Sequence, residues 1–104
     1  MKTEQKIPAI HPGEILQEEF LEPMGITPEQ LAQDIGITLI RIEELLHGKG
    51  KITANIALRL GRYFDIAPQF WLNLQDHYDL ESESDQLGDR LLSEVKISKY
   101  AVAA

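Results

Sequence analysis

Apolar side chains recur at every third or fourth position along most of the chain, which is the spacing of helices that bury one face. No segment before residue 80 alternates apolar and polar residues in the manner of a half-buried strand. Glycines, prolines and capping residues divide the pattern into five short runs. The chain is therefore predicted to be all-α, with five helices and no sheet before residue 80.

The first two predicted helices are separated by a proline and a cap. The first follows the turn residues HPG and spans about Glu14–Glu22, and Pro23 is expected to stop it. Its apolar stripe comprises Ile15, Leu16, Phe20 and Met24. The second begins after Thr27, whose hydroxyl can cap free N–H groups, and runs to about residue 35. Gly36 then suits the left-handed conformation that closes a helix.

Three further helices follow from the same signals. The third runs from the cap Thr38 to Gly48, and the fourth spans about Thr53–Phe64. The fifth begins at Pro68 in the stretch PQFWLNLQDHYDL. The apolar stripes predicted for these three helices contain Ile42, Leu45 and Leu46; Ile56, Ala57, Leu60 and Phe64; and Trp71, Leu74 and Tyr78.

The second and third predicted helices have the features of a helix-turn-helix. Ala32 is small enough for the two helices to cross closely, and Gly36 permits a tight turn between them. The apolar residues expected to hold the crossing are Leu31, Ile35, Ile42 and Leu45. A plain pair of core helices could show one of these features. Their joint occurrence between capped helices favours a helix-turn-helix that binds DNA.

The charge is distributed unevenly along the chain. The formal net charge of −7 at first argues against nucleic acid, because binding depends on Lys and Arg side chains that replace counterions on phosphate. Residues 31–64, however, hold five basic and three acidic side chains, a net charge of +2, whereas the other 70 residues carry −9. This segregation fits a nucleic-acid face on an acidic molecule, or a chance cluster on a solvated face.

Length and composition limit the remaining possibilities. The 104 residues suit a single domain, with a core at about 12–80 and an extension at about 81–104. There is no cysteine, and the three histidines lack metal-binding spacing, so we predict no metal and no cofactor. No nucleophile, base and orienting group can be assembled, which predicts that the protein is not an enzyme. No apolar run approaches the roughly 20 residues that cross a bilayer, so no membrane partner and a cytoplasmic location are expected.

Four stretches resemble a known family. They are HPGEIL at residues 11–16, LAQDIGI at 31–37, GKGKITANIALRL at 48–60 and FWLNLQDHYDL at 70–80, the last being the most specific. Together they are similar to the HigA-type antitoxins, in the VapI-like branch of the Xre/Cro helix-turn-helix superfamily. The resemblance covers residues 11 to about 80. It implies the five-helix Xre/Cro (lambda-repressor-like) fold, followed here by a short C-terminal extension.

The resemblance also implies a function. Such an antitoxin binds operator DNA as a homodimer, represses its own operon, and neutralises a co-encoded HigB-type toxin, usually a ribosome-dependent messenger-RNA ribonuclease. Two alternatives stay open. The helix-turn-helix could serve only as the scaffold of a protein-binding module, or the chain could be a stand-alone Xre-type transcriptional regulator.

Carried over position by position, the resemblance places the base-facing residues at the start of the third helix. They are Thr38, Leu39, Ile40, Arg41 and Glu44. Arg41 is able to bind guanine with two hydrogen bonds, the two apolar side chains could contact thymine methyl groups, and Glu44 could accept from cytosine N4. The family more often has Ser, Arg, Gln or Thr here, and His47 replaces a family Asn, so this chain departs from the usual pattern.

Phosphate contacts are implied on either side of the fourth helix's start. Lys49 and Lys51 occupy positions where the family meets phosphate. Asn55 lies in the first turn of the fourth helix, whose N-terminus can present N–H groups to a further phosphate.

The C-terminal part of the sequence gives weaker signals. The acidic stretch ESESD predicts a break, after which Leu87, Leu91 and Val95 recur as in a sixth short helix. Alternatively, EVKISKYAV could extend as an edge strand. An apolar stripe on a terminal segment of a small domain is often buried against a partner. The expected dimer or partner contacts are Phe70, Trp71, Leu87 and Leu91. Alternatively, the two aromatic residues could belong to the hydrophobic core.

Overall fold

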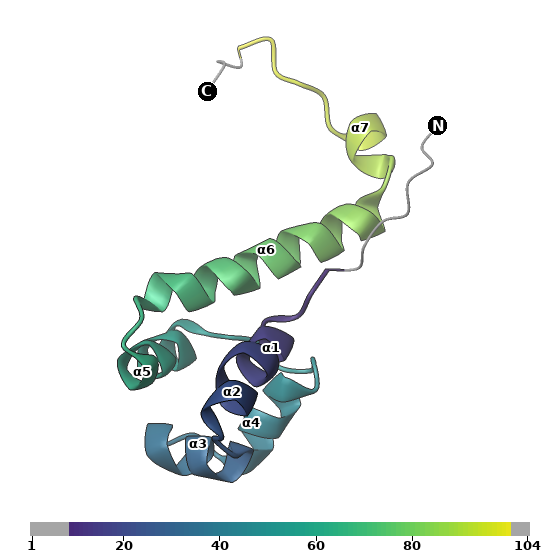
Figure 1. Ribbon diagram of the computed structural model, residues 1–104. Helices are drawn as coiled ribbons and strands as arrows, with labels where there is room; N and C mark the ends of the chain where they lie inside the picture. The colour runs from purple at the N-terminus through teal and green to yellow at the C-terminus, as the bar shows by residue number, and fades with distance from the viewer. Residues whose placement is uncertain (1–8, 101–104) are drawn as a thin grey trace.

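The computed structural model describes residues 9–100, and every regular element within that range is helical (Figure 1). The elements are α1 (Pro12–Ile15), the π-helical segment η1 (Leu16–Leu21), α2 (Glu22–Met24), α3 (Pro28–Ile35), α4 (Leu39–Leu46), α5 (Ala54–Phe64), α6 (Pro68–Leu87) and α7 (Arg90–Glu94). Because α1, η1 and α2 follow one another without a gap, they form one continuous helix. The all-α prediction is confirmed. Within residues 9–100, none of the helices combines the length and apolar character needed to cross a membrane.

The first helix passes through the proline that was expected to stop it. It continues to Met24 and ends at Gly25, whose φ of 68° is left-handed. The turn before Pro23 is a π turn, in which the Glu22 N–H donates to the Gln17 carbonyl. This wider turn gives the proline ring room, and proline has no N–H that would be left without a partner.

The threonine caps are all present. The hydroxyl oxygen of Thr27 accepts a hydrogen bond from the N–H of Gln30 at 3.0 Å, at the start of α3. Thr38 and Thr53 do the same for the third helical residue of α4 and of α5, at 3.3 Å each. These caps satisfy N–H groups that have no partner inside a helix, which explains why the helices begin where the sequence predicts.

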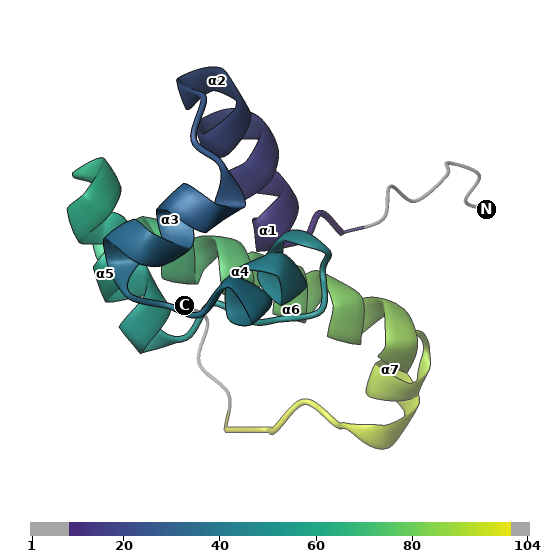
Figure 2. The ribbon, with the colours of Figure 1, turned by 90° about the horizontal axis from the view of Figure 1, so that it is seen from below.

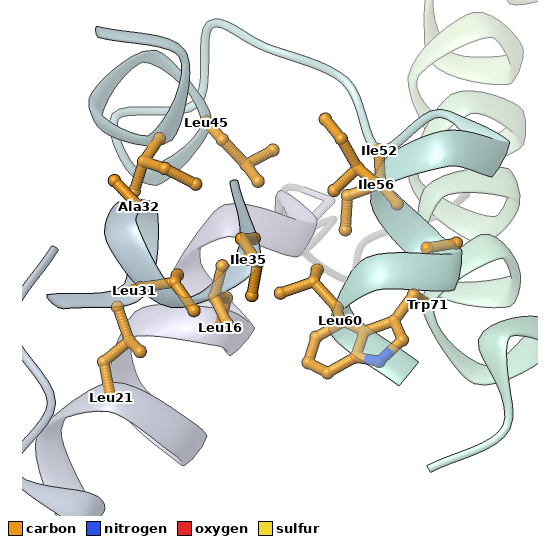
Figure 3. Packing of buried hydrophobic residues seen from close by; sticks show 12 residues of the cluster. Leu16, Leu21, Leu31, Ala32, Ile35, Leu45, Ile52, Ile56, Leu60 and Trp71 are labelled. Atoms are coloured by element: carbon orange, nitrogen blue, oxygen red, sulfur yellow. The ribbon is translucent and has the colours of Figure 1, made fainter. Parts of the chain in front are cut away.

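The core forms where the helices converge (Figure 3). Its buried apolar side chains are Leu16, Leu21, Leu31, Ala32, Ile35, Ile42, Leu45, Ile52, Ile56, Ala57, Leu60 and Trp71. Trp71 is fully buried beside Leu60. It is therefore a core residue, and none of its surface is available to a partner. Two positions of the first helix differ from the predicted stripe: Leu21 is buried, whereas Met24 is 56% exposed.

The predicted break at ESESD is wrong, because α6 continues through it to Leu87. Serine and glutamate are tolerated in a solvated helix, and the stretch contains neither Gly nor Pro. Side-chain pairs four residues apart also support the helix, including His77 Nε2 and Glu81 Oε2 at 4.0 Å. The helix ends instead at Gly88, where φ is 53°. The residues of α6 after Gln75 include none that is buried, and this part extends beyond the bundle (Figure 1).

The predicted sixth helix is present but shorter than its apolar pattern. It is α7, and Gly88 separates it from Leu87, so the expected stripe is divided between two elements. Leu91 and Val95 are 48% and 61% exposed. The edge-strand alternative is wrong for residues 95–100, which form no strand, while the last two residues of that stretch lie outside the described residues.

Candidate nucleic-acid interface

The helix-turn-helix is formed by α3 and α4, which lie in front of α6 when the molecule is seen from below (Figure 2). Gly36 turns the chain with a φ of 74°, and its N–H donates to the Ala32 carbonyl at 3.0 Å. The buried residues of the two helices are those predicted to hold the crossing. The turn leaves one long side of α4 facing solvent.

The exposed side of α4 differs slightly from the predicted base-facing set. Ile40 is 71% exposed, and Arg41 and Glu44 are exposed as well. Leu39 is partly buried and packs against the core, so only part of its side chain is available for the thymine contact considered for it. Thr38 uses its hydroxyl to cap α4, which is a structural role.

The polar groups on this side of α4 are one guanidinium and two carboxylates, from Arg41, Glu43 and Glu44. Within residues 9–100 the Arg41 side chain has neither a hydrogen-bond partner nor an ion pair, so its fork of donors is available to a ligand. The two acids would approach phosphates, which disfavours tight binding by this helix alone.

His11 holds the loop that follows α4. Its Nδ1 accepts a hydrogen bond from the N–H of Gly13 at 2.9 Å and caps α1. The hydrogen is therefore on Nε2, which donates to the Gly50 carbonyl at 2.9 Å. The imidazole also packs edge-on against Tyr78, with ring centroids 4.9 Å apart. One side chain thus connects the first helix, α6 and the loop that carries the two predicted phosphate-binding lysines.

Gly13 allows the first helix to lie directly against α4. A Cβ atom at this position would overlap the Leu45 carbonyl oxygen and lie 2.7 Å from the carbonyl carbon. Only a residue without a side chain fits here. In the stretch HPGEIL, the histidine therefore caps the first helix, the proline begins it, and the glycine allows it to lie close to α4.

Gln75 holds the same loop from α6. It is only 3% exposed, and its Oε1 accepts a hydrogen bond from the N–H of Ile52 at 2.8 Å. Its Nε2 donates to Asp79 Oδ1 at 2.9 Å. Sequence reasoning missed this residue, although one signal was available: Gln75 follows Trp71 by four positions, where the buried stripe of the helix calls for an apolar residue.

The two lysines of this loop have different surroundings. Lys51 Nζ lies 3.5 Å from Asp79 Oδ2, in an ion pair whose two side chains are 66% and 44% exposed. Lys49 is exposed, and no described residue pairs with its ammonium group. The two cations are therefore not equivalent as phosphate ligands.

Asn55 is oriented by an arginine that also fastens α5 to the helix-turn-helix. Arg59 Nη1 donates to the Ile35 carbonyl at the end of α3 at 2.7 Å, and its Nε donates to Asn55 Oδ1 at 2.8 Å. Because the amide oxygen is occupied, the Asn55 NH₂ group points its two donors elsewhere. At the other end of α5, the Tyr63 hydroxyl donates to Asp34 Oδ2 at 2.7 Å, and this hydrogen bond raises the pKa of Tyr63.

The arrangement therefore brings Ile40, Arg41, Glu44, Lys49 and Asn55 to the surface on and around the helix-turn-helix. Within residues 9–100 no group of histidine and acidic side chains is placed to hold a metal ion. An open hollow of about 390 Å³ beside this surface is lined by Asp34, Ile35, Arg59, Arg62 and Tyr63.

Comparison with known proteins identifies the family, although no protein-family model matches the chain. Virulence-associated protein I of Dichelobacter nodosus is 49% identical over 82 residues, which are 78% of this chain and 76% of that protein. The structure of an addiction module antidote protein of the HigA family from Coxiella burnetii superposes with a TM-score of 0.84 at 40% identity, covering 88% of this chain and all of the other.

A second solved relative is Pseudomonas aeruginosa antitoxin HigA, in a structure with the higBA promoter. It superposes with a TM-score of 0.82 at 39% identity, covering 85% of this chain and 96% of the other. Both solved relatives are antitoxins, a class of protein that is not enzymatic. This chain, like them, is not an enzyme. The fold, the stretches of sequence and these identities agree, and the chain belongs to the HigA family of helix-turn-helix antitoxins.

Proposed function

We propose that the protein is an antitoxin that represses its own operon by placing α4 in the major groove of operator DNA. The observation that carries this proposal is the exposed side of α4, where the Arg41 guanidinium has no partner within residues 9–100. The Pseudomonas relative, whose structure includes promoter DNA, supports it at 39% identity. A reporter gene behind the protein's own promoter should be repressed by the wild-type chain. Unchanged reporter output with and without the protein would contradict autorepression.

The proposed contacts divide into base reading and positioning. Arg41 binds a guanine with two hydrogen bonds, and Ile40 packs against a thymine methyl group. Lys49 and Lys51 bind phosphates, as does the NH₂ group of Asn55 at the N-terminus of α5. Most of the affinity therefore comes from the loop and α5, while sequence preference comes from α4.

Replacing Asn55 by aspartate should weaken operator binding about tenfold without loss of stability. The carboxylate still accepts from Arg59 Nε, and an acid in the first turn of α5 suits the helix dipole. The two donors are lost, however, and the new charge repels phosphate. Fluorescence anisotropy with promoter DNA and thermal unfolding measure the two effects.

Asn73→Asp is the matched control for this substitution, since Asn73 Oδ1 likewise accepts from a side chain one helical turn away, here Gln69 Nε2 at 3.0 Å. It changes the net charge equally but lies on α6. If both variants weakened DNA binding to the same extent, Asn55 would have no particular role in it.

Glu44 is expected to face the groove, where a carboxylate either accepts from a cytosine or repels phosphate. Glu44→Ala distinguishes these roles in the same anisotropy assay. Loss of preference for the operator over random DNA indicates cytosine readout. An equal gain on both DNAs indicates repulsion.

We further propose that the protein acts as a homodimer. One helix-turn-helix makes too few contacts for operator affinity, and two-fold symmetry would set the two copies of α4 about 34 to 36 Å apart, one turn of B-DNA. The proposed dimer surface includes Phe70, Leu87 and Leu91, together with neighbouring apolar side chains of the C-terminal segment. These neighbours are Leu92, Val95 and Ile97, which are 83%, 61% and 89% exposed.

The location of the dimer surface can be tested with two single variants, each of which replaces an exposed leucine by glutamate. Leu91→Glu should convert the dimer to a monomer in sedimentation experiments, because the charge would be buried between copies. Leu58→Glu is the control, since Leu58 is a comparable apolar side chain, 61% exposed, on α5. A monomer from Leu58→Glu and a dimer from Leu91→Glu would move the interface to α5.

The proposed toxin partner is a co-encoded basic ribonuclease of the HigB type. Its docking is supported by the acidic balance of −9 outside residues 31–64, which complements a basic surface. The association rate should fall markedly as salt rises from dilute buffer to physiological strength. An association rate that does not change with salt would contradict the role of charge in docking. Failure to co-purify with the neighbouring gene product would contradict the partnership itself.

One alternative has an observation in its favour. The two acids on the exposed side of α4, Glu43 and Glu44, suit a protein-binding module in which the helix-turn-helix is only a scaffold. We favour the repressor, since Arg41 and Lys49 have no competing partners among the described residues. A repressor of this kind acts in the cytoplasm, where its operator lies.

A further inference from the structure

Of the two lysines expected to bind phosphate, Lys51 already has an anionic partner within the protein. Its Nζ lies 3.5 Å from Asp79 Oδ2. A phosphate that binds Lys51 must either replace this carboxylate or approach close to it. Lys49, two residues earlier, faces no such competition from residues 9–100. The difference suggests that Asp79 affects how tightly the loop holds DNA.

Asp79 is fixed more firmly than an ordinary surface acid. Its Oδ1 accepts from Gln75 Nε2 at 2.9 Å, and the Gln75 amide is itself held at 2.8 Å by the N–H of Ile52. Gln75 is buried, so this chain of hydrogen bonds starts in the core and ends at the carboxylate. The second carboxylate oxygen is thereby aimed at Lys51. The pair depends on a positioned acid rather than on two mobile side chains.

We propose that Asp79 limits the DNA affinity of the protein by competing with backbone phosphate for Lys51. The inference rests on the proposed function, because it assigns a residue that sets the strength of the same DNA contact. A phosphate that binds Lys51 has to displace the carboxylate from the ammonium group, and the small free energy of an exposed ion pair is then subtracted from the free energy of DNA binding. The effect is independent of base sequence, since phosphate contacts carry no direct sequence information.

The test is Asp79→Asn in the full chain, measured by anisotropy with the protein's own promoter fragment and with random DNA at several salt concentrations. Asparagine keeps the oxygen that accepts from Gln75, so the loop should stay in place and the thermal unfolding midpoint should not fall. Affinity for both DNAs should rise about threefold. The plot of log affinity against log salt should steepen by up to about one unit, because one more cation acts on phosphate without an opposing acid.

Two controls separate this competition from a general loss of negative charge. Glu83→Gln removes a charge one helical turn further along α6, and it should give a clearly smaller gain than Asp79→Asn. The second control is the Lys51→Ala background, in which Asp79→Asn should lose most of its effect. An equal gain from Glu83→Gln, or a full gain without Lys51, would overturn the proposal.

The remaining outcomes are also decisive. If Asp79→Asn binds DNA more weakly than the wild type, Asp79 positions Lys51 for phosphate rather than competing with it, and the proposal is wrong. Binding by the wild type with no change in the variant overturns the inference and leaves the proposed function intact. If neither protein binds any DNA, the proposed function fails and the inference fails with it.

Discussion

Gly13→Ala is expected to destabilise the protein by about 3 kcal/mol, although it adds a single methyl group. The added Cβ would overlap the Leu45 carbonyl oxygen and approach the carbonyl carbon to 2.7 Å. Neither side can move easily, because Gly13 lies in the first turn of α1 and Leu45 lies in α4. The first helix would have to separate from α4, and the His11 hydrogen bonds on both sides would be strained.

Urea unfolding followed by circular dichroism measures this loss, and Gly25→Ala provides the control. A Cβ at Gly25 would meet no atom within 4 Å, but the φ of 68° there disfavours alanine. This control should cost about 1 kcal/mol from backbone strain alone. Equal losses from the two substitutions would show that a methyl group fits between Gly13 and Leu45, which would contradict the close approach of the two helices.

Arg41→Ala should weaken operator binding by about 1–3 kcal/mol, or roughly fivefold to 150-fold, and relax the preference at one base pair. The guanidinium is expected to make the main specific base contact, since Ile40 offers only a methyl contact and Glu44 an acceptor. Lys49→Ala should instead weaken operator and random DNA alike, and flatten the salt dependence by about one unit.

These two substitutions are best compared by anisotropy on the promoter fragment, on random DNA and on promoter fragments with single base-pair changes. Both positions are exposed, so neither variant should change stability by more than about 0.5 kcal/mol. If Arg41→Ala reduced binding to all sequences equally, Arg41 would be a phosphate ligand and the base reading would have to come from elsewhere.

Local signals were enough to predict most of the fold. The three threonine caps and the glycines that follow α3 and α4 act within one helical turn, so their residue types reveal where those helices start and stop. The apolar stripes of α3, α4 and α5 also match the buried residues, except that Leu46 and Phe64 are only partly buried, because each of those helices has one side against the core. The place of Arg41 among the base-facing residues came instead from the family resemblance, and the structure shows its side chain exposed.

The features that were missed depend on contacts between distant parts of the chain. The hydrogen bonds from His11 to the Gly50 carbonyl and from the Ile52 N–H to Gln75 join residues 39 and 23 positions apart. No periodicity reports such pairs. The ESESD stretch was misread because a solvated helix needs no apolar residues once α6 is anchored by Trp71. Pro23 was misread because a π turn, which no local signal predicts, accommodates it.

Binding of the wild-type protein to its own promoter is the most direct test of its function as a repressor. Anisotropy should be measured at physiological salt with a labelled fragment from upstream of the gene, in competition with an unlabelled fragment of shuffled sequence. We expect saturable binding of one dimer per operator, with the promoter preferred at least a thousandfold over the shuffled fragment. Equal competition by the shuffled fragment, or no binding, would contradict a repressor and favour the helix-turn-helix as a scaffold for protein contacts.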